Sequence, residues 1–153
     1  MADEVTQKKL KEAFRLFERE GCIEVDDLGI IMRHLNLNPT EKQISALKTE
    51  MGPNVIDYNV FEAVMSKIVL TSTYDGATLT LDTEDQLLRA FEILDPERNG
   101  LIPSEKLVQL LKSQGEPMTE EEINEFLQFA QSKDSAIIRY EEYVNLLCSH
   151  LKK

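Results

Sequence analysis

Several features that mark other classes of protein are missing from this sequence. No apolar run approaches the length of about 18 residues that a membrane-spanning helix requires, and the N-terminal Met-Ala-Asp-Glu does not resemble a signal peptide. Because the second residue is alanine, we also expect no N-myristoylation. The two cysteines, Cys22 and Cys148, lie far apart without a CxxC motif, so a reduced cytosolic setting explains them better than a disulfide.

Positive charge is also scarce. The 153 residues include 17 Lys and Arg against 28 Asp and Glu, which gives a net charge of −11. This balance argues against nucleic acid and anionic membranes as partners and favours a basic partner, although acidity also serves simply to keep a chain soluble. With 42% hydrophobic and 29% charged residues, the chain is expected to be globular, as one domain or two small lobes.

Catalytic motifs are absent as well. The two histidines, His34 and His150, have no nucleophile or metal-ligand pattern around them, and the sequence contains no P-loop and no dinucleotide fingerprint. Acidic pairs such as Asp26-Asp27 and Glu141-Glu142 fit loop and helix-start charges better than a catalytic pair. The sequence therefore predicts a protein that is not an enzyme and has no cofactor.

What the sequence does contain is a loop between two helical patterns, Asp95 to Lys106. Apolar residues recur at helical spacing on both sides of this loop, and Gly100 stands at its sixth position. A helix, a twelve-residue loop with glycine at position 6 and a second helix are the outline of an EF-hand. Ile102 at position 8 is expected to form a short strand that pairs with a neighbouring loop.

This loop lacks its closing ligand. Oxygen ligands are available from the side chains of Asp95, Glu97 and Asn99 and from the backbone of Leu101, but position 12 is Lys106 instead of a bidentate glutamate. Replacing two ligand oxygens with an ammonium adds a repelling charge, and a loss of roughly 4 kcal/mol already turns micromolar binding into millimolar binding. Pro103 at position 9 offers no side-chain oxygen that could hold a water on the ion. We expect no metal at this vestigial site.

The loop is one of four in the chain. Its repeats are centred on Ile23, Ile56, Ile102 and Ile138, which are 33, 46 and 36 residues apart. The first two loops are shortened, with Val60 at the final ligand position of the second, and the fourth keeps Glu142 but has Gln, Lys and Ser at its first ligand positions. Three capping boxes start helices at Thr40, Thr83 and Thr119.

These patterns predict an all-α fold with two lobes, each a pair of degenerate EF-hands joined by short antiparallel loop strands. The first lobe is expected over residues 1–70 and the second over residues 83–153. Between them, residues 71–82 are rich in threonine and contain Asp75-Gly76, so they predict a partly extended linker and not a continuous central helix.

Over nearly its whole length the chain resembles the calmodulin superfamily. The segments that match its helix and loop signatures are Lys11–Phe17, Asn38–Glu41 and Tyr140–Tyr143. Within that superfamily it is most similar to the calmodulin-like EF-hand subunits of the nexin–dynein regulatory complex of motile cilia, through Leu87–Asp95 and Gly115–Glu122. The linker at 71–82 departs from the charged helical tether usual in calmodulin-like proteins.

This resemblance implies a constitutive, calcium-insensitive subunit of the cilium or flagellum axoneme. Its expected partners are helical or coiled-coil proteins, some of them IQ-bearing, in a hetero-complex and not a homo-oligomer. Two alternatives remain open: an essential-type myosin light chain that binds an IQ helix, and a weak calcium sensor acting through the third loop.

Apolar side chains on the predicted helices are the candidates for a partner-binding groove, since methionines and aromatic residues suit an adaptable apolar surface. The alternative for each is a place in the core of its lobe. The candidates are Phe14, Phe17, Met32, Met51 and Met65 in the first lobe, and Phe91, Leu94, Leu110, Leu111, Phe126 and Leu147 in the second.

Overall fold

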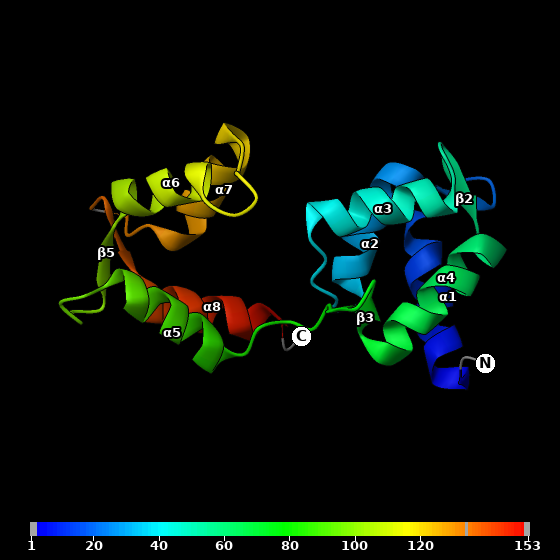
Figure 1. Cartoon of the computed structure of the whole chain (residues 1–153), viewed down its shortest axis with the longest axis horizontal. Coiled ribbons are helices and arrows are strands. Elements are labelled where there is room, and N and C mark those ends of the chain that lie inside the picture. The colour runs from blue at the N-terminus through cyan, green and yellow to red at the C-terminus, as the bar shows by residue number, and fades with distance from the viewer. Residues whose placement is uncertain (1–2, 134, 152–153) are drawn as a thin grey trace. The chain divides into compact units, whose positions relative to one another are not determined.

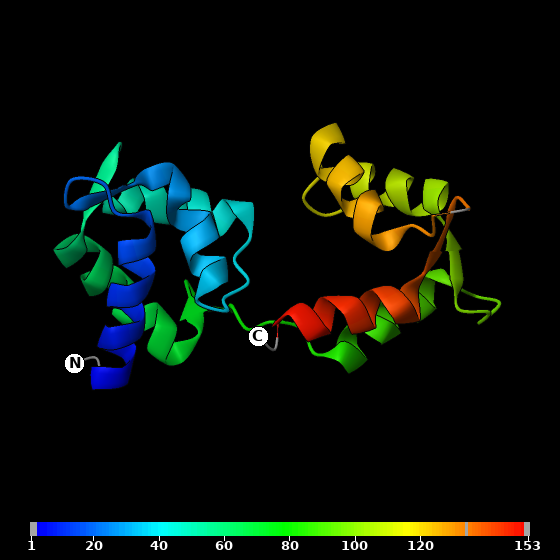
Figure 2. The same ribbon diagram turned by 180° about the vertical axis from the view of Figure 1, so that it is seen from behind.

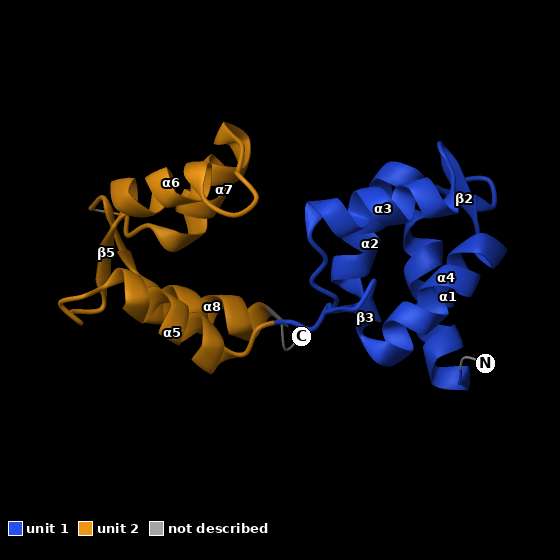
Figure 3. Cartoon of the chain, in the orientation of Figure 1, with its two compact units in different colours: residues 1–81 blue, residues 82–153 orange. Residues whose placement is uncertain are grey.

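The structure is a computed structural model that describes residues 3–133 and 135–151. The chain divides into two compact units, residues 1–81 and residues 82–153, which are coloured separately in Figure 3. Each unit is built from helix–strand–helix repeats, as the sequence predicts, and each is described by itself below. None of the described helices is both long enough and apolar enough to cross a membrane.

Unit 1 contains two such repeats followed by a hairpin (Figure 1). The first repeat consists of α1 (Glu4–Phe17), β1 (Cys22–Glu24), the short 3₁₀ helix η1 (Val25–Asp27) and α2 (Leu28–His34). The second consists of α3 (Glu41–Met51), β2 (Val55–Asp57) and α4 (Tyr58–Thr71). The hairpin consists of β3 (Thr73–Tyr74) and β4 (Ala77–Thr78).

The core of unit 1 is closed. Helices α1 and α4 lie against each other, and Phe14 of α1 meets Tyr58 and Phe61 of α4 at ring-centroid distances of 5.2 and 5.3 Å. Such edge-to-face and tilted ring pairs add to the stabilisation from apolar burial. All four helices contribute fully buried side chains: Leu10, Leu28, Ile31, Met32, Leu47, Phe61 and Met65.

Unit 2 repeats the same plan with a looser core. It consists of α5 (Glu84–Leu94), β5 (Leu101–Pro103), α6 (Ser104–Ser113), α7 (Glu120–Ala130), β6 (Ile137–Arg139) and α8 (Tyr140–Leu151). Helix α5 packs against α8 and α6 against α7, as both ribbon views show (Figures 1 and 2). Helix α5 has no fully buried residue, so its apolar face is only half covered by the rest of the unit.

The start and pairing signals predicted from the sequence are confirmed. Thr40, Thr83 and Thr119 each form a complete capping box, in which the threonine hydroxyl accepts a bond from the backbone N–H three residues later. In unit 1, Ile23 pairs with Ile56 in the antiparallel β1–β2 ladder, and in unit 2 Ile102 pairs with Ile138 in β5–β6. All four isoleucines are buried and join the two loops of each unit.

The segment predicted as a linker, residues 71–82, is largely folded onto unit 1. Helix α4 ends at Thr71, and the β3–β4 hairpin then turns the chain back at Asp75-Gly76, where both residues have positive φ. Leu79 follows the hairpin and is completely buried in the core of unit 1. The boundary between the compact units therefore falls after Leu81, at the far end of the predicted linker.

Candidate functional site

Local hydrogen bonds within the protein occupy the two loops of unit 1. In the first, Arg19 and Cys22 exchange two backbone hydrogen bonds of 2.7 and 3.1 Å across a two-residue turn at Glu20 and Gly21, both with positive φ. This tight turn leaves no cage for an ion. In the second loop, the carboxylate of Asp57 accepts a bond from the backbone N–H of Val60 and so caps α4.

The third loop is the most complete, and its first ligand position is occupied by protein donors. The carboxylate of Asp95 is 3% exposed and accepts a hydrogen bond of 2.8 Å from the hydroxyl of Tyr140, at the start of α8. The same carboxylate oxygen accepts a second bond of 2.8 Å from the backbone N–H of Gly100. Asp95 is thus satisfied by groups of unit 2 itself.

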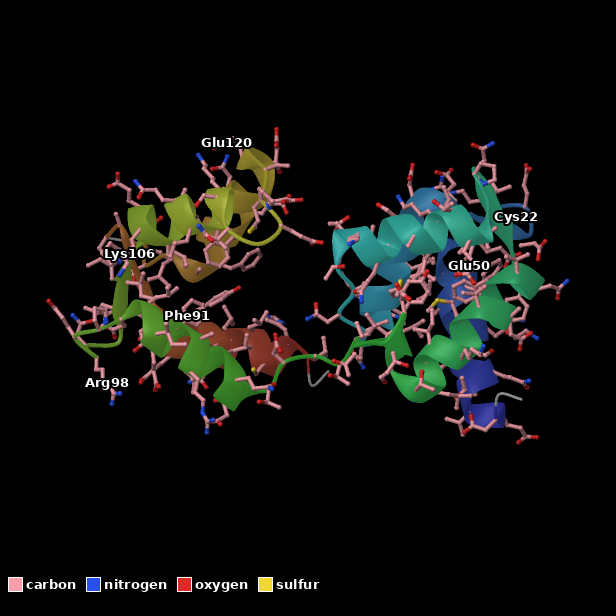
Figure 4. All side chains as sticks on the ribbon, in the orientation of Figure 1. Cys22, Glu50, Phe91, Arg98, Lys106 and Glu120 are labelled. Carbon is pink, nitrogen blue, oxygen red and sulfur yellow. The ribbon has the colours of Figure 1, made fainter. Side chains whose placement is uncertain are left out.

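Lys106 stands where the bidentate glutamate of a calcium loop would stand, and it also has a structural partner. Its ammonium donates a hydrogen bond of 2.9 Å to the backbone carbonyl of Leu94, at the C-terminal end of α5 (Figure 4). The last carbonyls of a helix have no partner within the helix and carry partial negative charge, so a cation is favourable there. The side chain therefore links the start of α6 to the end of α5.

The hydrogen bonds to Asp95 shift the pKa values of both Asp95 and Tyr140. Burial alone would raise the pKa of Asp95, but the bond from Tyr140 and the backbone bonds from Gly100, Asn99 and Arg98 outweigh it, so this pKa lies below its usual value. The bond to Asp95, together with burial, raises the pKa of Tyr140 to about 12. At neutral pH the pair is a carboxylate that accepts from a neutral phenol.

The fourth loop has lost the shape of a cage as well as its ligands. Gln131 forms a bridge with Ile138, and the backbone N–H of Ser132 donates to the carbonyl of Ile137 at 3.0 Å. Glu142, the retained final ligand, is exposed. Within residues 3–133 and 135–151, no group of three or more His, Cys, Asp or Glu side chains is arranged to hold a metal ion.

An apolar groove lies on unit 2 between α7 and α8. It has a volume of about 420 Å³, and its apolar lining recurs at helical spacing on both helices. Phe129, 67% exposed, and Leu146 are the most exposed of its apolar side chains, while Glu122, Glu125 and His150 supply polar groups. The apolar lining residues are Met118, Phe126, Phe129, Tyr143, Leu146 and Leu147.

Aromatic contacts connect this groove to the third loop. Phe126 meets Tyr143 edge-on at 5.4 Å, and Tyr143 meets Phe91 of α5 edge-on at 6.0 Å. Phe91 in turn stacks on Tyr140 at 5.6 Å with nearly parallel rings, beside the Asp95 bond. Phe126, Tyr143 and Phe91 are half-buried and Tyr140 is buried, so the ring contacts run from the groove to the apolar face of α5 and on to the third loop.

The predicted partner-binding residues fall into two groups. In unit 2, the six candidates Phe91, Leu94, Leu110, Leu111, Phe126 and Leu147 are all half-buried, as residues lining an open surface would be. In unit 1, Phe14, Met32, Met51 and Met65 are buried in the core and only Phe17 is half-buried. Two of the unit 2 candidates, Phe126 and Leu147, line the α7–α8 groove itself.

The sequence prediction did not include four apolar lining residues of this groove, namely Met118, Phe129, Tyr143 and Leu146. The signal was available for three of them. Phe129 stands three residues from the predicted Phe126, Tyr143 stands four residues from the predicted Leu147, and Leu146 stands three residues from Tyr143. Met118 lies in the turn before α7, and no helical spacing points to it.

Paired helix–loop–helix repeats joined by two-stranded loop ladders define an EF-hand protein. The family model for an EF-hand domain pair matches residues 84–148. The chain is 34% identical to Dynein regulatory complex protein 8 of Mus musculus, over 92% of this chain and 86% of the relative. It is 30% identical to a calmodulin-like protein of Dictyostelium discoideum, over 96% and 95% of the two chains.

A solved structure has a similar fold. The Physarum polycephalum myosin II regulatory domain includes a chain that is 28% identical to this one, covering 90% of this chain and 91% of the other with a TM-score of 0.65. The chain belongs to the calmodulin-like EF-hand family.

Proposed function

We propose that this protein is a non-catalytic, calcium-insensitive subunit that binds a basic amphipathic helix of a larger assembly through unit 2. The observation that carries the proposal is the acidic-rimmed apolar groove between α7 and α8. A groove of this kind accepts the apolar face of a helix, with anchors spaced at i, i+3, i+4 and i+7.

Charge favours a basic helix as the ligand. Glu122 and Glu125 lie on α7 beside the apolar lining, and the whole chain carries a net charge of −11. Complementary charge around an apolar contact speeds association and selects the partner more than it strengthens the final complex. A helix with Leu or Phe on one face and Lys or Arg on its flanks satisfies both parts of the surface.

Calcium independence is supported by the third loop. A calcium-sensing EF-hand must first bind the ion and then open its helices to expose a groove. Here the hydroxyl of Tyr140 and the ammonium of Lys106 already bond to the groups at the start of the loop, and the apolar groove is exposed in their presence. These contacts support a groove that is exposed without calcium.

Two relatives support alternative cellular settings. Similarity to the mouse dynein regulatory complex protein supports a place in the corresponding complex of the cilium or flagellum axoneme, where the partner would be a helical or coiled-coil subunit. The alternative is a myosin light chain bound to an IQ helix, which the similarity to the myosin II regulatory domain favours. In both settings the proposed ligand is a helix that binds in the α7–α8 groove.

The groove is tested with a synthetic peptide that presents leucines at i, i+3, i+4 and i+7 and lysines on both flanks. We expect binding in EGTA, measured by isothermal titration, and Phe129→Asp to weaken it at least about 30-fold, or about 2 kcal/mol, as loss of an interface anchor does. Ile93→Asp is the matched control, because Ile93 is an 81% exposed apolar residue of α5 outside the groove. Equal weakening by both variants would refute the assignment of the groove.

The setting is tested by purifying the tagged protein in EGTA from ciliated cells and identifying bound chains by mass spectrometry. Recovery of axonemal coiled-coil proteins, lost with Phe129→Asp and kept with Ile93→Asp, supports the dynein regulatory complex. Recovery of a myosin heavy chain with the same dependence makes the light-chain alternative correct.

A further inference from the structure

The segment after α4 folds back onto unit 1 as a strap, defined here as residues 72–79. Ser72 ends α4 in the left-handed conformation, and the hairpin pairs Thr73 with Thr78 and Tyr74 with Ala77. Its turn, Asp75-Gly76, suits this geometry because both residues tolerate positive φ. The hairpin returns the chain to the end of α4 instead of leading it away.

Leu79 ties this strap to two parts of unit 1. Its backbone N–H donates to the carbonyl of Ser72 at 2.7 Å, and its carbonyl accepts a bond of 2.7 Å from the backbone N–H of Asn38. Asn38 lies in the connection between α2 and α3, so the two bonds join the end of α4 to that connection. The side chain of Leu79 is completely buried in the same core cluster as Phe14, Met32 and Met65.

Tyr74 adds a third tie, to α3. Its hydroxyl donates to a carboxylate oxygen of Glu50 at 3.3 Å, and its ring packs against the core cluster. A half-open hollow of about 530 Å³ lies beside the hairpin, lined by Glu50 of α3, by one face of α4 and by Thr73, Tyr74 and Asp75. The strap thus bridges α3 and α4.

We propose that this strap is an internal clamp that holds unit 1 closed, so that unit 1 exposes an apolar face only when the strap is displaced. EF-hand pairs have two packing arrangements, and the open one requires the helices of the pair to separate. Bonds from Leu79 and Tyr74 span the helices that would have to part. The clamp on unit 1 does not depend on the function proposed above. Its consequence, that the partner helix binds to unit 2 alone, does rest on that function.

Hydrogen exchange of the full chain tests the clamp. We expect Leu79→Ala to raise the exchange rate of the Asn38 amide at least about tenfold and to raise exchange in α3 and the end of α4. Amides of the β5–β6 ladder in unit 2 should keep their rates. Thr80→Ala is the matched control, since Thr80 is exposed and adjacent to Leu79. Unchanged exchange in α3 and α4 after Leu79→Ala would overturn the proposal.

Leu79→Ala could instead raise amide exchange in the β1–β2 ladder as much as in α3 and α4. That result would mean that unit 1 as a whole has unfolded, and the exchange rates of the wild-type chain would then test the clamp. A clamp that opens by itself lets the Asn38 amide exchange at least about tenfold faster than the β1–β2 amides. Equal rates in the wild type would mean that the strap opens only with the whole unit, which would refute a clamp.

The same leucine–lysine peptide then separates this proposal from the function proposed above. We expect one peptide to bind per wild-type chain and a second to bind after Leu79→Ala. If the wild type and the variant each bind one peptide while exchange is increased in the variant, the clamp stands. The claim that the strap restricts the partner helix to unit 2 would then be wrong. No peptide binding by the wild type refutes the groove on unit 2 and leaves the exchange result to decide the clamp.

Discussion

The hydroxyl of Tyr140 donates a hydrogen bond of 2.8 Å to the carboxylate of Asp95, although the two residues are 45 positions apart in the chain. The bond joins the first position of the third loop to the start of α8. Because Asp95 is almost fully buried, the carboxylate depends on such internal donors to compensate for lost water.

Removing the Tyr140 hydroxyl should destabilise unit 2. In Tyr140→Phe the stacking on Phe91 remains, but one oxygen of Asp95 loses a buried donor. We expect the thermal midpoint of unit 2 to fall by about 5 °C, measured by calorimetry. Tyr143→Phe is the control, since Tyr143 makes ring contacts with Phe91 and Phe126. A midpoint unchanged in Tyr140→Phe would contradict the role of this bond.

The Asp95 carboxylate should make the stability of unit 2 fall in acid. Its folded pKa lies below the unfolded value, so its contribution is fully present above the ordinary pKa of 3.8 and is lost as pH falls through the lowered pKa. Tyr140 affects stability in alkali, because its folded pKa lies above the unfolded value of 10.0. Its contribution to the stability of unit 2 is fully present below pH 10 and is lost as the pH rises through about 12.

The measurement is the urea midpoint of unit 2 between about pH 2 and pH 7, for the wild type and Asp95→Asn. We expect the variant to show a shallower acid decline, because it lacks the titrating group. Identical slopes for the two proteins would show that other carboxylates control the acid limb.

Restoring the final ligand should restore calcium binding. Lys106→Glu returns a carboxylate to position 12 beside Asp95, Glu97 and Asn99, and it removes the ammonium from the end of α5. We expect a Kd below about 1 mM by isothermal titration, against no saturable binding at that concentration in the wild type. Lys11→Glu makes the same charge change on α1. Wild-type heat at micromolar calcium would instead revive the calcium-sensor alternative.

Binding of the basic peptide should weaken with salt. Glu125 is exposed at the rim of the groove, and such charges act through screened attraction. We expect the affinity to fall about tenfold between roughly 50 and 500 mM ionic strength, and Glu125→Gln to reduce that dependence. A peptide with glutamine in place of lysine provides the control, and it should show little salt effect. Salt-independent binding of the lysine peptide would exclude a role for the acidic rim.

Local signals accounted for most of the fold. The capping boxes at Thr40, Thr83 and Thr119 and the isoleucine pairs depend on contacts within a few residues or on a repeated pattern, and both are visible in one sequence. The strap was not predicted, because burial of Leu79 depends on the end of α4 and the α2–α3 connection being close in space. From sequence alone, a threonine-rich segment with one turn signal predicts a linker, because the core that buries Leu79 forms only in the folded unit.

The sequence by itself determined the EF-hand repeats and the loss of the ligand at Lys106, since these follow from residue type at fixed spacing. Only the tertiary structure decided which groups bond to Asp95 at the first position of the loop. Tyr140 is an ordinary helix-start residue until the paired loops bring its hydroxyl to Asp95. The tertiary structure also decided that similar apolar helices form a closed core in unit 1 and an exposed groove in unit 2, because packing depends on which faces meet and not on hydrophobic content.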